Sequence, residues 1–501
     1  MLPQDDAMPE GREAITGSEL EKGLSKVVKD GLTTQAMSVL TGSIFLTAFA
    51  LALGANNLVI GLIAAIPAFA QLAQIPTVYL VERYRTRRRI CVCASAISRG
   101  FWLVIAAIPF IAPPGTAIPI LVGAISLNAV FASIGGCSWN SWMRDLVPIA
   151  RLGSFFSRRL FLATILGIAL SWAAGIFIDG WDARASWPSA YGYSILFVLA
   201  FLAGMIGVFF LSSTPEPCLV RRQEELPFHR RILLPFADAN FHRLIRFMGC
   251  WNFAVNLATP FFTVFMIQVL ALDLSVIVAL SILSQLMNCA FLQIWGSLSD
   301  RFSNKSILGI CCPLFLVSIF AWTFTVIPDQ RFLSLPLLAA IHLLSGIAGA
   351  GITLASSNIA LKLAPGGQAT AFLAGNAMTN SLAAGIAPVA GGIIADAFAD
   401  RRLMWTLSWT SEAGTTSFET LHLEHWGFLF FFASVLGVFA LYLLRTVRES
   451  GEAPREVVVK ELVTCVRQRV PDRTSLRRAL STVISTLCLQ HGTDLRRRKP
   501  E

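Results

Sequence analysis

The sequence predicts an all-α membrane protein whose twelve transmembrane helices form two six-helix bundles related by a parallel repeat. Hydrophobic residues make up 55% of the 501-residue chain and charged residues only 14%, whereas a soluble domain carries roughly 25% charge. Twelve apolar segments are each long enough to cross a bilayer, which takes about 20 helical residues. Sequence landmarks also recur at a nearly constant spacing in the two halves of the chain.

The apolar segments set the expected helices. They cover residues 32–55, 57–80, 90–112, 117–143, 158–178, 190–212, 244–270, 274–298, 306–327, 333–361, 368–395 and 426–445. Gly and Pro within them do not argue against spanning, because membrane helices tolerate both. The polar start of the chain lacks the short apolar core of a signal peptide, so we expect the first helix to act as the insertion signal.

Three landmarks define the repeat. Glu82-Arg83 and Asp300-Arg301 are 218 residues apart, Pro148 and Pro365 are 217 apart, and two segments that end in Asp179 and Asp396 are also 217 apart. The two copies have the same orientation, which is a parallel repeat. We therefore expect a tail at 1–30, a bundle at 31–214, a linker at 215–241, a second bundle at 242–447 and a basic tail at 448–501.

The loop charges predict the orientation. Loops on one side hold 18 Lys and Arg residues and loops on the other side hold 4. By the positive-inside rule the richer side is cytoplasmic, which places both termini in the cytoplasm. The net charge of +10 lies in these loops and in the tails, a pattern that argues for membrane orientation and against a nucleic-acid partner.

Charged residues follow the second and the eighth apolar segments in a shared pattern. The later copy reads Gly296-Ser-Leu-Ser-Asp300-Arg301-Phe-Ser-Asn-Lys305, and the earlier copy has Glu82, Arg83 and Arg87 but Val78 at the Gly position. The later copy resembles the signature loop of the major facilitator superfamily. The segment from Trp139 to Pro148 also looks like a bacterial branch of that superfamily, so the resemblance implies a bacterial inner-membrane protein.

This resemblance covers about residues 31–447 and implies a mechanism for the charged loops. In the family, the acid and base of this loop are held to latch the two halves in the outward-facing state. Asp145, at the end of the fourth segment, is similar to a further acid that joins the latch. The implied latch comprises Glu82, Arg83, Arg87, Asp145, Gly296, Asp300, Arg301 and Lys305. The alternative is that these charges only set the orientation.

The apolar segments contain no Asp or Glu, and Arg99 is the one charge well inside them. An intramembrane Arg is a functional hypothesis by default. Without an acid partner in the segments, Arg99 has an anionic solute, backbone carbonyls or the latch as candidate partners. A structural Arg that bonds to neighbouring helices is an equal alternative. His342 is the buried group with an ordinary pKa near neutrality, although packing is the commoner use of such a residue.

Polar and aromatic side chains within the segments complete the candidates for a solute site. Interhelical hydrogen bonds and aromatic packing explain most such residues in membrane proteins. The substrate-binding candidates are Arg99, Asn128, Trp139, Asn140, Trp251, Asn252, Asn288, His342, Asn376 and Asn380.

These observations favour a transporter of a small organic solute that works by alternating access, with the coupling ion left open. The alternative is a non-transporting scaffold or sensor that uses the same fold. The sequence lacks a phosphate-binding P-loop, a buried acid pair and CxxC metal spacing, so we expect no enzyme activity, metal or cofactor. Residues 474–490 place apolar side chains on one stripe, which predicts either an amphipathic helix on the inner leaflet or a solvated tail.

Overall fold

The structure is a computed structural model of the full chain. It describes residues 16–469 except for 85, 114, 149–150, 185–186, 218–233, 326–330, 366–368 and 412–413. The stripe at 474–490 lies outside the described residues. Twelve helical spans in this part of the chain are long and apolar enough to cross a membrane. The predicted fold class is therefore confirmed.

The first six spans form one bundle. Short breaks divide the first two spans into pieces, so the bundle holds more helices than spans. Its elements are α1 (Gly17–Leu40), α2 (Ser43–Ala52), α3 (Asn57–Ala70), η1 (Gln71–Ala73), α4 (Gln74–Tyr84), α5 (Arg87–Ile111), α6 (Ala117–Leu146), α7 (Leu152–Ala183) and α8 (Ser189–Ser212).

The last six spans form the second bundle, which carries two strands and one further helix besides its spans. Its elements are α10 (Ala239–Ala258), α11 (Phe261–Gln268), α12 (Leu274–Arg301), α13 (Asn304–Ala321), η3 (Trp322–Phe324), α14 (Arg331–Leu363), α15 (Ala369–Ala397) and α16 (Trp426–Thr446). The strands β1 (Arg402–Ser411) and β2 (Gly414–Glu424) lie between α15 and α16, and α17 (Arg455–Arg469) follows α16.

The first helix begins at Gly17, well before the predicted start at residue 32. Thr16 caps it: its hydroxyl accepts from the Glu19 backbone, and the Glu19 carboxylate accepts from the Thr16 backbone. This reciprocal cap satisfies two backbone donors that a helix start would otherwise leave unpaired. Hydropathy missed the added turns because their outer face is polar, although Gly23, Leu24 and Val27 are buried.

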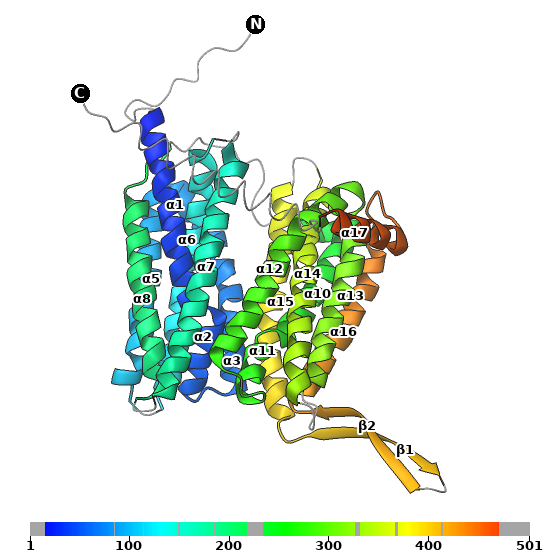
Figure 1. The fold of residues 1–501 in the computed structure, drawn as a ribbon. Coiled ribbons are helices and arrows are strands. Elements are labelled where there is room, and N and C mark those ends of the chain that lie inside the picture. The colour runs from blue at the N-terminus through cyan, green and yellow to red at the C-terminus, as the bar shows by residue number, and fades with distance from the viewer. Residues whose placement is uncertain are drawn as a thin grey trace, which may run out of the picture.

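The sequence did not predict the β-hairpin. The strands pair antiparallel from Arg402 opposite Glu424 to Ser411 opposite Gly414, with an irregularity between Trp405 and Thr406. Their alternating polar and apolar residues suit strands, but no apolar run marks them. The hairpin projects from one end of the second bundle, and α17 lies across the other end (Figure 1). We call these two ends of the molecule the hairpin end and the α17 end.

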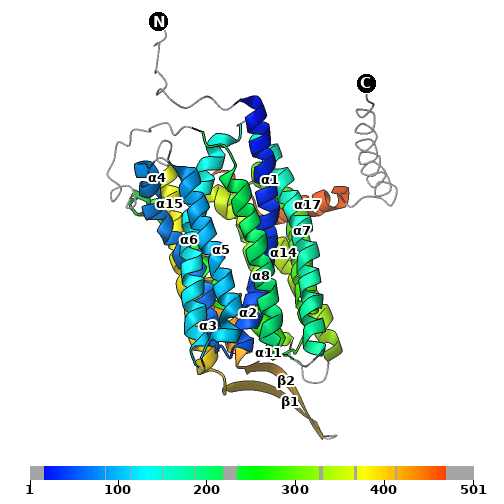
Figure 2. The same cartoon turned by 90° about the vertical axis from the view of Figure 1, so that its left-hand side faces the viewer.

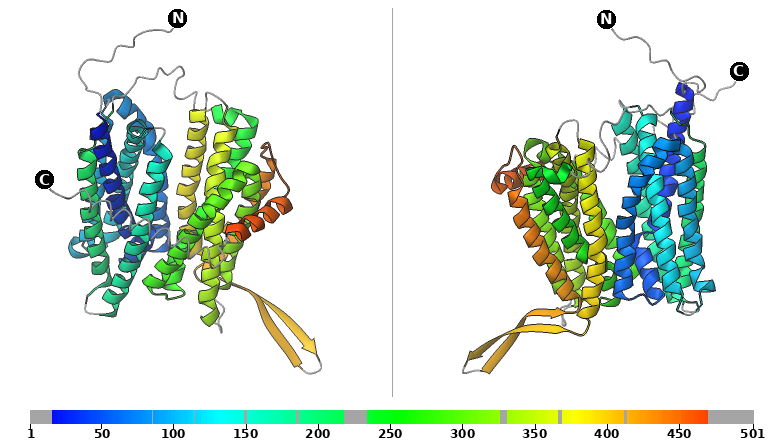
Figure 3. Two further views of the ribbon diagram at one scale, coloured as in Figure 1. Left: turned by 45° about the horizontal axis from the view of Figure 1, so that its top comes forward. Right: turned by 180° about the vertical axis from the view of Figure 1, so that it is seen from behind.

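The two bundles stand side by side with their helices roughly parallel (Figures 1 and 2). They approach each other through α3 against α15 and α7 against α12, toward the hairpin end, as the view from behind also shows (Figure 3). Glycines permit close approach: a Cβ on Gly61 would lie 2.2 Å from the Pro388 carbonyl oxygen, and one on Gly385 would lie 2.7 Å from the Phe69 ring.

Candidate functional site

Arg87 is the centre of the charged cluster at the α17 end of the first bundle. Its side chain is 1% exposed and donates to the Asp145 carboxylate at 2.5 Å and to the Ser141 and Pro217 carbonyls at 3.0 Å each. Glu216, just after α8, lies 4.0 Å from its Nε. Arg87 therefore ties the start of α5 to the end of α6 and to the segment after α8, all within one bundle.

The segment after α16 holds the second signature loop. The Glu449 side chain is fully buried; it accepts from Lys362 Nζ, Asn304 Nδ2 and the Lys305 backbone at 2.8–3.0 Å. Lys305 Nζ donates to Glu452 at 2.9 Å, and Arg301 pairs with Glu461 of α17. The sequence analysis missed these acids, although one signal was present: an acid follows the last helix of each bundle, at Glu216 and at Glu449.

The remaining residues of the implied latch are more exposed. Arg83 is exposed beside the Tyr84 ring, and Asp300 is exposed at the end of α12. A Cβ on Gly296 would meet Leu354 of α14 at an ordinary 3.9 Å. The side chain of Glu82 lies outside the described residues. The pairs that the structure does contain, Arg87–Asp145, Arg301–Glu461 and Lys305–Glu452, each join residues of the same half.

Arg99 has an acid partner, so the expectation that the spans lack one was wrong. Asp30 in α1 is 2% exposed; its carboxylate lies 3.7 Å from Arg99 Nη2 and 3.8 Å from Arg159 Nη2 of α7. Arg99 also donates to the Gly204 carbonyl of α8 and to Thr34 Oγ1. Asp30 was missed because the first span was predicted to begin two residues after it. The cluster lies among α1, α5, α7 and α8, inside the first bundle.

Four asparagines lie on the neighbouring helices α10 and α15 of the second bundle, and two of them bond across the helices. Asn252 and Asn256 are one helical turn apart on α10, and Asn376 and Asn380 are one turn apart on α15. Asn252 Nδ2 donates to Asn380 Oδ1 at 3.2 Å, and Asn256 Nδ2 donates to the Asn252 carbonyl at 2.8 Å. Asn376 Oδ1 is buried without a hydrogen-bond partner. We call these four residues the carboxamide cluster.

The cluster lies near the middle of the membrane-spanning length. Asn252 is the fourteenth residue of the 30-residue span Ala239–Gln268, and Asn380 is the tenth residue of the 27-residue span Ala371–Ala397. Transporters place their solute sites near this depth. Sequence reasoning named Asn252, Asn376 and Asn380 as separate candidates. The structure joins Asn252 to Asn380, with Asn256 one turn away on α10 and Asn376 one turn away on α15.

The other candidates lie elsewhere. Asn128 Nδ2 donates to the Ser98 carbonyl at 2.8 Å, between α6 and α5. Trp139 receives the Arg159 guanidinium at 5.0 Å, Trp251 packs on Phe315, and the His342 ring meets Trp322 edge-on. These contacts are made within one bundle. Asn140 is exposed on α6, and Asn288 points toward Gly349 of α14.

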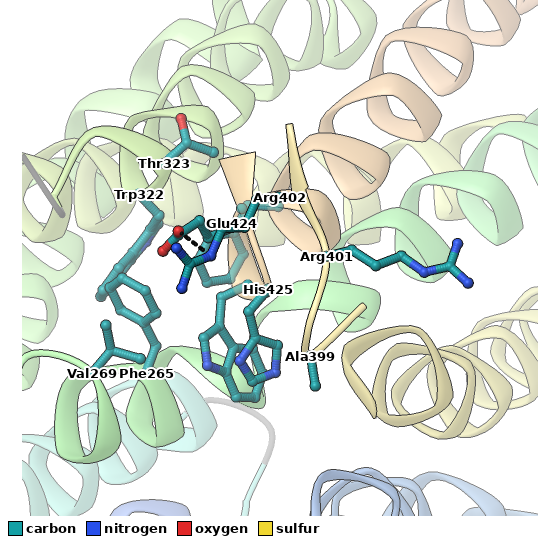
Figure 4. Close-up of a pocket in the computed structure, with 12 residues that line it drawn as sticks. Phe265, Val269, Trp322, Thr323, Ala399, Arg401, Arg402, Glu424 and His425 are labelled. Carbon is teal, nitrogen blue, oxygen red and sulfur yellow. Dashed lines mark ion pairs between the residues drawn. The ribbon is translucent and has the colours of Figure 1, made fainter. Parts of the chain in front are cut away.

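A separate cavity of about 230 Å³ opens at the base of the hairpin (Figure 4). Trp322, Phe265 and Phe430 form its aromatic wall, and Arg402 pairs with Glu424 at 2.8 Å at its rim. Burial lowers the pKa of His425, which also lines the cavity. The cavity belongs to the second bundle and not to the contact between bundles. Among the described residues, no group of three His, Cys, Asp or Glu side chains is placed to hold a metal ion.

Two six-helix bundles related by a parallel repeat are the architecture of a membrane transporter. The profile of the Major Facilitator Superfamily matches residues 31–341 and 252–490. The chain belongs to this superfamily, and its function is transmembrane transport of a solute. No functionally curated protein matches the sequence.

Several solved structures share the fold. A nucleoside transporter, NupG, has a TM-score of 0.61 at 12% identity over 86% of this chain and 100% of its own. A D-xylose–proton symporter has a TM-score of 0.58 at 16% identity over 88% and 100%. A bacterial homologue of the human lysosomal transporter Spinster, inward-facing and unoccupied, has a TM-score of 0.57 at 13% identity over 89% and 100%. At these identities the likeness is one of fold.

Proposed function

We propose that this chain carries a small, uncharged polar solute across the membrane by alternating access, with the carboxamide cluster as part of its binding site. The observation that carries the proposal is the bond between Asn252 and Asn380 across α10 and α15 near mid-depth, with Asn376 Oδ1 one turn away, buried and without a partner among the described residues. A carboxamide both donates and accepts hydrogen bonds, so it suits hydroxyl or amide groups of a neutral solute.

The charge of the solute follows from the same residues. An ionised solute at this depth would need an opposite charge to offset its desolvation, and the cluster offers only neutral amides. An anionic solute was suggested by Arg99 as an unpaired charge. Because Arg99 is paired with Asp30, that suggestion loses its support.

The orientation and the conformational state are part of the proposal. The loop charges favour a cytoplasmic α17 end in a bacterial inner membrane. The bundles meet toward the hairpin end, which supports an inward-facing state, and one similar structure is described as inward-facing. The solute would then reach the carboxamide cluster from the cytoplasm in this state.

Binding of neutral solutes to purified protein tests the proposal. We expect sugars, polyols or nucleosides in a panel of neutral and charged solutes to raise the melting temperature of the wild type. Asn376→Ala should weaken that binding about tenfold, since a lost hydrogen bond is worth about 0.5–1.5 kcal/mol and a partnerless buried acceptor costs more. Asn376 Oδ1 has no hydrogen-bond partner among the described residues, so the variant should fold as the wild type does.

Asn128→Ala is the control, because Asn128 bonds within the first bundle. It should lower the melting temperature without changing the affinity for the solute. Stabilisation by charged solutes alone, or full affinity in Asn376→Ala, would contradict the proposed site.

A further inference from the structure

Two aspartates at the hairpin end bond to helix starts in the opposite bundle. Asp179, near the end of α7, accepts from the Leu274 and Ser275 backbone N–H groups of α12 at 2.9 Å each. Asp396, near the end of α15, accepts from the Leu58 backbone N–H of α3 at 3.2 Å and from Asn57 Nδ2 at 2.8 Å. Each carboxylate therefore joins one bundle to the other.

A glycine one turn before each aspartate touches the same helix start. A Cβ on Gly175 would lie 3.1 Å from the Ser275 Cα. A Cβ on Gly392 would lie 2.8 Å from the Leu58 Cα and 2.5 Å from the Asn57 carbonyl oxygen. The Gly allows the close approach that brings the carboxylate to the backbone N–H groups. We call Gly175–Asp179 and Gly392–Asp396 the two Gly-x-x-x-Asp pairs.

The internal repeat relates both pairs and both of their targets. Gly392 and Asp396 follow Gly175 and Asp179 by 217 residues, and Leu274 and Ser275 follow Asn57 and Leu58 by the same 217. The structure thus makes one contact twice, with the roles of the bundles exchanged. The contact between bundles gives a role to the two repeated segments that end in Asp179 and Asp396, which are not part of the implied latch.

The physical reason for the contact is the helix start. The first N–H groups of a helix have no partner within the helix, and its partial positive charge attracts a carboxylate. The N-cap residue of α12, Asp273, makes no side-chain capping bond, so Asp179 of the other bundle supplies that cap. A hollow of about 490 Å³ lined by Asp179, Asp182 and Leu274 lies beside this contact.

We infer that the two Gly-x-x-x-Asp pairs are the gate that holds the hairpin end closed, each aspartate capping a helix start of the opposite bundle. The inference rests on the proposed alternating-access function. When the hairpin end opens, α7 leaves α12 and α15 leaves α3, so both caps break together. Asp179 and Asp396 are positioning residues, since they set the balance of states and lie away from the carboxamide cluster.

The size of the effect follows from the strength of one cap. A carboxylate at a helix start is worth about 0.3–1 kcal/mol, and 1.4 kcal/mol is a factor of ten. Loss of one cap should therefore raise the open population about two- to fivefold. Because the two contacts are separate, their effects should multiply, which gives about three- to thirtyfold for Asp179→Asn with Asp396→Asn.

Labelling of a buried cysteine measures the open population. Val278 is 1% exposed, and its side chain faces Gly175 between α12 and α7. A charged thiol reagent reaches V278C only when these helices separate. If the reagent reacts more slowly than the helices close again, the labelling rate is proportional to the open population. The protein without V278C keeps its native cysteines, and its background labelling is subtracted from that of V278C. We expect D179N/D396N to speed labelling by the factor above, and Gly392→Ala to speed it through steric clash without removing a charge.

Asp182→Asn with Asp400→Asn is the matched control, because both residues are exposed acids near the same helix ends. The control should label at the wild-type rate. Equal rates in D179N/D396N and the wild type, or an equal rise in the control, would overturn the gate. The readout needs no solute, so a change in labelling without transport would leave the gate standing and refute the proposed function instead.

Discussion

At the hairpin end, Asp179 and Asp396 reach across to the opposite bundle, whereas at the α17 end Arg87 and Glu449 bond within their own bundles. The contrast shows that charged residues have two different roles in this fold. Bonds inside a bundle keep it rigid, and bonds between bundles set which end is closed. Alternating access needs both kinds of bond. Each bundle moves as a rigid body only if the bonds inside it are stronger than the bonds between bundles that break.

The strength of the contacts agrees with these roles. Arg87, Asp30 and Glu449 are buried charges with several partners each, and removing one partner of a buried pair costs about 3–5 kcal/mol. Asp396 is exposed and Asp179 is half-buried, and a carboxylate at a helix start typically contributes about 0.3–1 kcal/mol. The gate contacts are therefore weak enough to break during a transport cycle.

The largest expected effect comes from the buried cluster of the first bundle. Asp30→Ala leaves Arg99 and Arg159 without their shared acid, so we expect a loss of about 3–5 kcal/mol in the free energy of unfolding. Thermal unfolding in detergent measures it. The double variant with Arg99→Met should recover part of the loss, because it removes one of the two uncompensated charges and leaves only Arg159. A single variant as stable as the wild type would contradict the internal role of this cluster.

A glycine between the bundles should give a different result. Gly61→Ala places a methyl group where the Pro388 carbonyl oxygen lies 2.2 Å away, and overpacking of this kind costs about 1–3 kcal/mol. The bundles can relieve the clash by separating, so we expect faster labelling of V278C and a nearly unchanged melting temperature. Gly123→Ala, with open space around its Cβ position, is the control. If Gly61→Ala lowers the melting temperature without faster labelling of V278C, this contact stabilises the fold in the way that contacts within a bundle do, which would contradict its role between the bundles.

The smallest effect should come from Glu452 in the segment after α16, where Glu449 provides the buried comparison. Glu449→Gln removes the charge from three bonds to a fully buried carboxylate, and hydrogen bonds to charged groups contribute about 1.5–3 kcal/mol. Glu452 is 42% exposed, so Glu452→Gln should cost at most about 1 kcal/mol. Limited proteolysis between α16 and α17, together with melting temperatures, compares them. Equal losses in both variants would contradict the burial argument.

Much of the fold could be predicted from the sequence, for physical reasons. A bilayer requires long apolar helices, so the twelve spans were visible as apolar runs, and the repeat was visible as a constant spacing. The hairpin was not visible, because its strands β1 and β2 mix polar with apolar residues and form no long apolar run. Asp30 was not placed in a span, because the first turns of α1 are polar on the face that points away from the bundle. Their average hydropathy is therefore too low for an apolar segment.

The candidate site was predictable only in part. Asn252, Asn376 and Asn380 were recognisable as polar residues in apolar helices, but their meeting depends on how α10 packs on α15. The partners of Arg99, Arg301 and Lys305 are distant in sequence. The repeated Asp179 and Asp396 were found from spacing alone, and only the structure gives their targets.

Paired distances in one protein test the central claim most directly, namely that the bundles move as rigid bodies and exchange which end is closed. Spin labels on T116C and A399C report the hairpin end, and labels on R144C and L361C report the α17 end. Without solute, D179N/D396N should lengthen the first distance and shorten the second relative to the wild type, while distances within each bundle stay constant. Two distances that lengthen together, or that do not change, would contradict the account.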